Sequence, residues 1–196
     1  MEPYWENKEH RLAIYHGNCV EVMPQLEHKF DLCLTDPPYD LSEEGKHGIH
    51  NKLLEVAEGS IVFSPPENQW LPADQYGFWV KPISTKNTSR RYSRFVEMIF
   101  FYGNLGWNTD RHWSQYTNVF TDLVDGETNH PYEKPTSLIR RLILNHTNAG
   151  DSIIDPFLGG GTILFEAHRI GRCGVGIETS EEYCHLAAER LDEEIE

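Results

Sequence analysis

The feature that most constrains the fold is a short apolar run that ends abruptly in an acid, two prolines and an aromatic ring. Residues 30–34 form the run, and Asp36-Pro37-Pro38-Tyr39 follow it. Such a run predicts a buried strand. Each proline fixes its own φ and biases the residue before it away from helix, so the chain leaves this strand through a stiff, extended corner. Because ligands of open α/β sheets bind outside the carboxyl ends of strands, we expect Asp36 and Tyr39 to lie at a functional edge.

Segments with strand and helix patterns alternate along the chain. Strands are predicted at residues 10–16, 30–35, 60–64, 76–83, 95–102, 152–155 and 173–177, and helices at residues 20–26, 53–57, 135–145, 163–170 and 180–191. Residues 40–50 are polar and contain glycine, which predicts a mobile loop, and residues 103–133 are predicted to be irregular. The alternation predicts an α/β fold: a mostly parallel central sheet, helices on both faces, and an antiparallel pair (76–83 with 95–102) near one edge.

Length and composition indicate one globular domain. The 196 residues are 39% hydrophobic and 12% aromatic, which suffices for a sizeable core. No apolar run approaches the ~18 residues of a membrane span, and the first residues lack the basic and apolar segments of a signal peptide. The four cysteines show no CxxC or metal-ligand spacing and the histidines are scattered, so we expect no metal site and a reducing, cytoplasmic compartment.

The residues of the proline corner suit a planar ligand that carries an amino group. Asp36 offers a charged acceptor, a carbonyl beside a proline offers a second acceptor, and Tyr39 offers a flat face. The exocyclic amine of a nucleobase is a poor nucleophile because its lone pair is delocalised into the ring. Two acceptors on its hydrogens draw the nitrogen toward tetrahedral geometry and accommodate the positive charge that develops during attack.

A second corner, with nucleotide-binding character, lies near the C-terminus. Residues 153–162 combine a strand, an Asp-Pro-Phe corner and a glycine loop that opens a helix. Glycines let the backbone approach a ligand closely, which we expect of Gly161, and the helix start offers free N–H groups. Glu178 ends the next strand, where an acid can bind ribose hydroxyls. The G-x-G-x-x-G fingerprint of dinucleotide-binding proteins is not matched, since Thr162-Ile163-Leu164 follow Gly161.

Both corners resemble motifs of one enzyme family. Asp36-Pro37-Pro38-Tyr39 resembles the DPPY signature of the amino-methyltransferases, which methylate adenine N6 or cytosine N4 in DNA with S-adenosylmethionine (SAM). The resemblance implies that these four residues are catalytic. Asp36 and the Pro37 carbonyl would hold the amine in line with the methyl group, and Tyr39 would stack on the base. The target base would have to leave the duplex to reach them.

The cofactor motif of the same family has the pattern Asp-Pro-Phe-x-Gly-x-Gly-Thr. Every fixed position is matched here, by Asp155, Pro156, Phe157, Gly159, Gly161 and Thr162. Upstream, Lys134-Pro135 opens a segment similar to the family's Lys-Pro-x-x-Leu, which lines the methionine end of the cofactor. Gly17-Asn18-Cys19 resembles its Gly-Asp-Cys, with Asn18 in place of the acid. The resemblance implies that these residues, with Asp36 and Glu178, bind SAM.

The order of the motifs resembles the β type of the family. It implies a single Rossmann-like methyltransferase domain over residues 1–196, with a small target-recognition insertion around residues 79–133. The formal net charge of −14 opposes DNA binding, but residues 79–94 contain five basic residues and no acid. We predict that four of them contact DNA phosphates: Lys86, Arg90, Arg91 and Arg94. The alternative is that they pair with the chain's own carboxylates.

Three functions follow from these observations. The first is a DNA adenine-N6 methyltransferase, because aspartate at the first signature position favours adenine in the family. The second is amine methylation of cytosine N4, of RNA or of a protein side-chain amide. The third is a non-catalytic, cofactor-binding subunit of a methyltransferase complex, which the short stretch between the two motifs favours. A homodimer or a partner subunit would supply the missing recognition surface.

Overall fold

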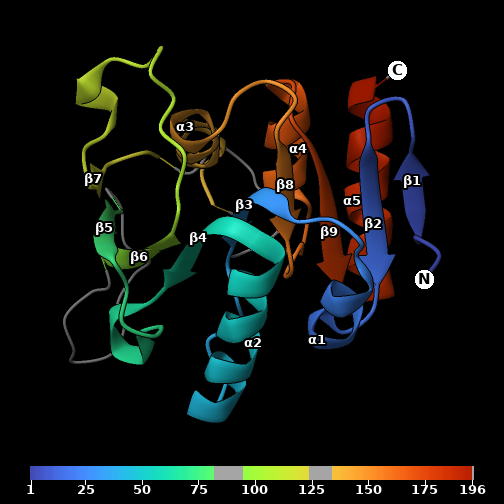
Figure 1. The fold of residues 1–196 in the computed structure, drawn as a ribbon, viewed down its shortest axis with the longest axis horizontal. Helices are drawn as coiled ribbons and strands as arrows, with labels where there is room; N and C mark the ends of the chain where they lie inside the picture. The colour runs from blue at the N-terminus through green and yellow to red at the C-terminus, as the bar shows by residue number, and fades with distance from the viewer. Residues whose placement is uncertain (82–94, 124–133, 196) are drawn as a thin grey trace.

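The computed structural model describes residues 1–81, 95–123 and 134–195. These residues form one nine-stranded sheet in the order β1-β2-β9-β8-β3-β4-β6-β5-β7 (Figure 1). The strands are β1 Trp5–Asn7, β2 Leu12–His16, β3 Phe30–Thr35, β4 Ala57–Ser64, β5 Gln75–Val80, β6 Val96–Gly103, β7 Val119–Phe120, β8 Ser152–Asp155 and β9 Cys173–Glu178. The helices are α1 Cys19–Val22, α2 Glu43–Val56, α3 Thr136–His146, α4 Thr162–Arg169 and α5 Glu181–Ile195, with 3₁₀ turns η1 Met23–Gln25, η2 Pro66–Asn68 and η3 Trp113–Gln115.

The sheet is parallel in its centre, and antiparallel pairs join β1 to β2 and β6 to β4 and β5, while β7 pairs parallel with β5 at the other end. The parallel neighbours of the centre are β2, β9, β8, β3 and β4. The predicted α/β class and the predicted antiparallel pair are therefore confirmed. β1 and β7, of 3 and 2 residues, were not predicted, because so few residues show no period.

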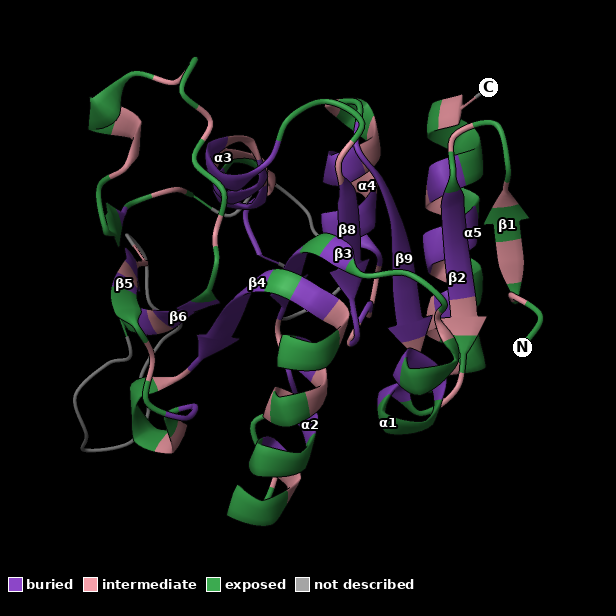
Figure 2. Cartoon of the chain, viewed as in Figure 1, coloured by how far each residue is buried: buried purple, intermediate pink, exposed green. Residues whose placement is uncertain are grey.

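Both faces of the central strands are buried, which explains their nearly continuous apolar sequences. In β3, Leu32 and Leu34 pack with residues of α3 and α4, whereas Cys33 packs with residues of α1 and α2 on the other face. α5 covers β2 near one end of the sheet. Figure 2 shows the buried strands between helices whose outer faces are exposed. The predicted helices on both faces are confirmed.

The prediction of a mobile loop at residues 40–50 is wrong, because α2 begins at Glu43. Ser42 caps this helix: its hydroxyl accepts a hydrogen bond from the backbone N–H of Gly45 at 3.1 Å. Ile49 and Leu53 face the sheet at helical spacing, and Lys46 is buried beside them. Two apolar residues among glycines and charged residues give only a weak helical pattern in the sequence. The helix forms because its apolar face packs against the sheet.

The carboxyl ends of the five parallel strands share one edge of the sheet, here named the carboxyl edge. β6 runs the other way, so its beginning lies at this edge: Met98 is opposite Ser64, the last residue of β4. Gly103, the last residue of β6, is opposite Gly59 at the amino edge. In the described part of the chain, every helix is too short or too polar to cross a membrane.

Candidate active site

The carboxyl edge brings the two predicted corners together. Cys33 of β3 is paired with Ile154 of β8, so Asp36, which follows β3, and Asp155, which ends β8, lie at the ends of neighbouring strands. The hydroxyl of Thr35 donates a hydrogen bond to Asp155 Oδ1 at 2.8 Å and ties the two strand ends. We name residues 36–39 the signature corner, and residues 155–162 with Glu178 the glycine corner.

The signature corner presents an acid and a ring to solvent. The side chain of Asp36 is 22% exposed and Tyr39 is 39% exposed. The loop after β4 supports the corner, since the Asn68 amide donates a hydrogen bond to the backbone carbonyl of Tyr39. Asn68 is itself held by the buried Lys46 ammonium, whose Nζ lies 2.6 Å from its Oδ1. Tyr39 thus has a fixed backbone beside an open face.

Lys134 lies against the signature corner. Its Nζ donates to Asp36 Oδ2, lies 2.9 Å from Glu97 Oε1 and lies 3.3 Å from the Tyr39 hydroxyl. The same ammonium faces the Phe63 ring at 5.2 Å. The resemblance had assigned Lys134 to the methionine end of the cofactor. The structure places its charge on the carboxylate of Asp36.

Glu97, which the sequence analysis did not single out, completes this charged network. It belongs to β6 and is 2% exposed. Its Oε1 accepts a hydrogen bond from the Tyr39 hydroxyl at 2.7 Å, and its Oε2 lies 2.7 Å from Lys81 Nζ. The signal in the sequence is one acid inside an otherwise apolar strand, Val96-Glu97-Met98-Ile99-Phe100. We refer to Asp36, Tyr39, Lys81, Glu97 and Lys134 as the charged network.

The pKa values of the two carboxylates in the network, Asp36 and Glu97, are shifted in opposite directions. Burial is the largest influence on Glu97 and disfavours its charge, but Lys134 and Lys81 together lower its pKa below the ordinary value. Burial outweighs Lys134 at Asp36, and Glu97 adds repulsion, so the pKa of Asp36 is raised. Glu97 is therefore the stable anion, and Asp36 is the carboxylate that more readily accepts a proton.

The glycine corner is built mainly from backbone. Gly159 has φ +50° and donates its N–H to Glu178 Oε2 at 2.9 Å. A Cβ added at Gly159 would meet no atom within 4 Å, so open space lies in front of this backbone. A Cβ at Gly161 would lie 2.8 Å from the Cβ of Ala187 in α5. The missing side chain of Gly161 therefore lets α5 pack against the start of α4, whereas Gly159 faces open space. The expected approach of Gly161 to the cofactor stays a prediction.

Other residues of the cofactor motif shape the loop. Asp155 is 2% exposed, and its Oδ1 accepts hydrogen bonds from the Thr35 hydroxyl and from the backbone N–H of Phe157, at 3.1 Å. Burial raises the pKa of Asp155 to about 7, although both hydrogen bonds oppose the shift. Thr162 and Pro156 are buried, and Thr162 Oγ1 accepts a hydrogen bond from Arg190 Nη1 at 3.0 Å. These side chains fix the loop and leave Phe157, Gly159 and Glu178 partly exposed.

The remaining predicted cofactor residues flank the carboxyl edge. The exposed Asn18 caps α1, with its Oδ1 accepting from the N–H of Val20 at 3.0 Å. Cys19 is buried, and burial raises its pKa to about 11, which makes the thiol unreactive. Pro135 is buried and precedes α3. Within the described residues, the structure shows no group of three or more metal-ligating side chains.

Four predicted phosphate-contacting residues lie outside the described residues: Lys86, Arg90, Arg91 and Arg94. Lys81, the first base of the same run, is described. It pairs with Glu97 and lies over the ring of Trp79, 4.7 Å from the centroid. This base therefore neutralises a carboxylate of its own chain.

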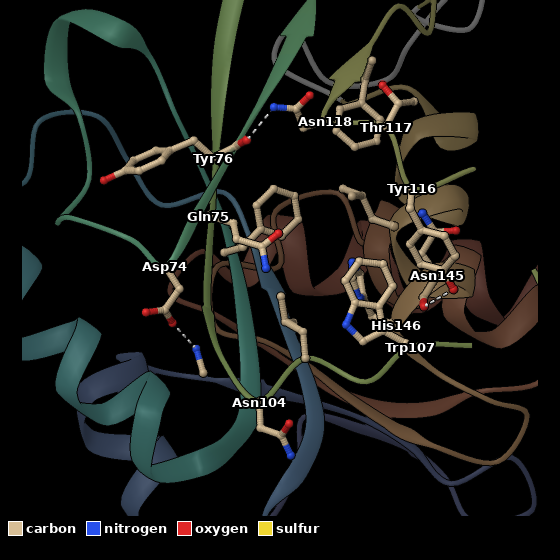
Figure 3. A pocket seen from close by; sticks show the side chains of 15 residues that line it. Asp74, Gln75, Tyr76, Asn104, Trp107, Tyr116, Thr117, Asn118, Asn145 and His146 are labelled. Atoms are coloured by element: carbon tan, nitrogen blue, oxygen red, sulfur yellow. Dashed lines mark hydrogen bonds between the residues drawn. The ribbon is translucent and has the colours of Figure 1, made fainter. Parts of the chain in front are cut away.

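A separate hollow of about 240 Å³ lies at the amino edge (Figure 3). Trp107, Tyr116 and His146 give it aromatic walls, and the rings of Trp107 and Tyr116 lie 4.3 Å apart. Gly103, which lines it, ends β6 at the edge opposite Asp36. Trp107 therefore lies in the hollow at the edge opposite Asp36.

Comparisons with known proteins show which family this chain is similar to. Residues 67–189, more than half of the chain, match the DNA methylase family. Type II methyltransferase M2.DpnII of Streptococcus pneumoniae is 29% identical over 192 residues, covering 79% of this chain and 70% of that protein. Type II methyltransferase M.HpaI of Haemophilus parainfluenzae is 46% identical over 65 residues, a match that spans 33% of this chain and 21% of M.HpaI.

The fold is also similar to that of a solved methyltransferase structure. The crystal structure of the M1.HpyAVI–SAM complex has a TM-score of 0.72 and 27% sequence identity, covering 91% of this chain and 98% of that chain. The family match includes β5 to β9 and therefore both Glu97 and the glycine corner. The chain belongs to the DNA methylase family of N6/N4 methyltransferases.

Proposed function

We propose that this chain is a SAM-dependent DNA methyltransferase that methylates adenine N6. The observation that carries the proposal is the meeting of two corners on neighbouring strands: Asp36 with Tyr39 after β3, and the open glycine loop after β8. The first corner suits an amino group on a planar base, and the second suits a nucleoside cofactor. The aspartate at position 36 favours adenine over cytosine, as the resemblance implies.

The residues of the glycine corner fit SAM. Gly159 leaves open space and an N–H at the loop, and Glu178 offers a carboxylate for ribose hydroxyls. Phe157 is partly exposed in the same loop. The exposed Asn18 follows β2, the strand that pairs with β9, and β9 ends in Glu178. The related M1.HpyAVI structure is a complex with SAM. When bound, SAM supplies a methyl group on a positively charged sulfur.

The signature corner would hold and activate the base amine. Asp36 and the carbonyl of Pro37 accept hydrogen bonds from the two N–H groups of the amine, which directs the nitrogen lone pair away from the ring. Tyr39 stacks on the base and returns part of the stacking lost when the base leaves the duplex. After transfer the nitrogen carries a positive charge and must lose a proton. Asp36, whose pKa is raised by burial, accepts it.

Cytosine N4 is the second candidate for the acceptor. Both bases present a planar amine to the same two acceptors, so the geometry of Asp36 admits either. We further propose that the chain acts as one methyltransferase domain, that residues 79–133 contribute to target recognition, and that Lys86, Arg90, Arg91 and Arg94 contact phosphates. A second copy or another subunit would extend the DNA-binding surface.

The test is a methyl-transfer assay with product analysis. Purified protein is incubated with SAM carrying a labelled methyl group and with duplex DNA, single-stranded DNA or RNA, and the nucleosides are separated. We expect labelled N6-methyladenine from DNA. Asp36→Asn should abolish the label, and Asp40→Asn, which changes an exposed neighbouring acid, should retain it. Label in N4-methylcytosine would select the second candidate, and label only in RNA would overturn the proposal.

A further inference from the structure

We propose that Glu97 is a positioning residue for methyl transfer: its carboxylate holds the Tyr39 hydroxyl and shares Lys134, so that one oxygen of Asp36 stays free for the base amine. This inference rests on the proposed function. It adds a residue from β6, which lies outside both sequence motifs.

The first argument is the proton of Tyr39. The hydroxyl has one proton and two carboxylate neighbours, Glu97 Oε1 at 2.7 Å and Asp36 Oδ1 at 3.3 Å. The shorter contact takes the proton. Burial and both nearby carboxylates raise the pKa of Tyr39, so the hydroxyl stays protonated and keeps donating. Asp36 Oδ1 is thereby left as an acceptor, while the ring of Tyr39 is anchored at its far end.

The second argument is the charge of Lys134. Its ammonium lies between Asp36 Oδ2 and Glu97 Oε1, and its side chain is 6% exposed. Without the Glu97 charge, this buried cation would have Asp36 as its remaining carboxylate partner. A carboxylate fully engaged with an ammonium is a poorer acceptor for a second donor. Because Glu97 is present, the Lys134 ammonium is shared between two carboxylates, and Asp36 keeps its ability to accept a proton.

The third argument is the cost of the arrangement. An acid buried on a central strand loses its hydration, and replacing a buried ion pair with apolar residues is often neutral or stabilising. Glu97 nevertheless accepts a hydrogen bond from the Tyr39 hydroxyl and forms ion pairs with Lys81 and Lys134. The side chains it touches either belong to the signature corner or hold its charge. Packing alone does not explain this acid, and positioning does.

The charges around Asp36 fix the sign of a pH test. Glu97 and Lys134 face it within the network, Lys81 lies behind Glu97, and Asp155 adds negative charge from β8. Removing the negative charge of Glu97 lowers the pKa of Asp36. Removing the positive charge of Lys81 raises it. The acid limb of the kcat/KM profile should move in the corresponding opposite directions.

The experiment compares Glu97→Gln and Lys81→Met with the wild-type protein in the duplex assay. For Glu97→Gln we expect kcat to fall about 10- to 100-fold, the loss typical of a small misplacement of reacting groups, with the SAM Kd changed less than about twofold. Its acid limb should move to lower pH. The Lys81 side chain is 35% exposed, so we expect Lys81→Met to fold, and its acid limb should move to higher pH.

The matched control is Glu166→Gln. Glu166 in α4 is also buried and lies 2.7 Å from Arg140 Nε, but it is outside the site, so its loss should lower thermal stability and leave kcat unchanged. The proposal is overturned if folded Glu97→Gln keeps the wild-type kcat and pH profile, if Glu166→Gln loses as much kcat, or if Lys81→Met leaves the acid limb in place. An inactive wild-type protein would instead contradict the proposed function itself.

Discussion

The signature corner and the glycine corner lie at the ends of neighbouring strands, yet they are held in place in different ways. The signature corner depends on charged side chains from separate parts of the chain: Asp36, Lys81, Glu97 and Lys134 converge there. The glycine corner is local, since the loop folds on its own backbone and on Glu178 of the next strand. The first is suited to altering charge on a reacting group, and the second to admitting a ligand close to the backbone.

This difference suggests a division of work between the corners. Charged side chains that act on the transition state should change turnover with little effect on cofactor binding. Backbone openings should change cofactor binding first. The predictions below test the division, in order of decreasing expected effect.

The largest effect is expected from Asp36→Asn. The amide keeps the shape of the side chain but loses the charge that stabilises the amine as it becomes positive. Loss of one such group typically costs about 10²- to 10³-fold in kcat, and the lost proton acceptor adds to this. We therefore expect kcat to fall by about 10³-fold or more in the duplex assay. A decrease of less than about tenfold would show that Asp36 does not hold the amine.

Gly159→Ala should weaken SAM binding by about tenfold or more. The methyl group enters the open space before the loop, and a left-handed φ of +50° costs a non-glycine residue about 1–2 kcal/mol. Gly150→Ala is the matched control, since Gly150 has φ +88°, no atom within 4 Å of its added Cβ, and a place in the turn before β8 at the amino edge. Calorimetry should show the affinity loss only at position 159. Equal affinities for the two variants would place SAM elsewhere.

Asp155 should make stability depend on pH. Its pKa is about 7 in the folded protein and about 3.9 in an unfolded chain, so the folded state binds the extra proton between these values. The free energy of unfolding should therefore fall as pH rises from about 4 to 7, by up to about 1.4 kcal/mol per pH unit.

Asp155→Asn keeps the acceptor for Thr35 and Phe157 and removes the titration. Denaturant melts of both proteins across this range give the difference directly. A wild-type minus variant difference that is flat with pH would contradict the shifted pKa of Asp155.

The smallest effect is expected from Trp107→Ala. Trp107 lines the hollow at the amino edge and is 55% exposed. Because the reaction is assigned to the opposite edge, kcat and the SAM Kd should stay within about twofold of wild type. A tenfold loss of kcat in a folded variant would bring the amino edge into the catalytic account.

The sequence predicts the glycine corner more completely than the signature corner, for a physical reason. The glycine corner lies within 24 consecutive residues of a strand–loop–helix–strand unit, 155–178, so local spacing describes it. Glu97 reaches Tyr39 only because β6 pairs antiparallel with β4 and returns its first residues to the carboxyl edge. No local pattern contains that pairing. The start of α2 was missed because its polar residues and glycines outnumber the apolar positions that face the sheet.

The sequence also did not reveal the packing partners of two motif residues. Gly161 was expected to face the cofactor, but its packing partner Ala187 comes from α5, which no motif includes. Lys134 was expected at the methionine end of the cofactor, and its ammonium lies on Asp36. In both cases the neighbour is set by tertiary packing, which a local motif does not contain.

The measurement that tests the division of work most directly is the SAM affinity of Asp36→Asn. Calorimetry on the purified variant and the wild-type protein gives both Kd values under one condition. The account predicts a variant that binds SAM within about threefold of wild type and transfers almost no methyl group, because Asp36 acts on the amine and not on cofactor binding. A variant that has lost SAM binding together with turnover would contradict it.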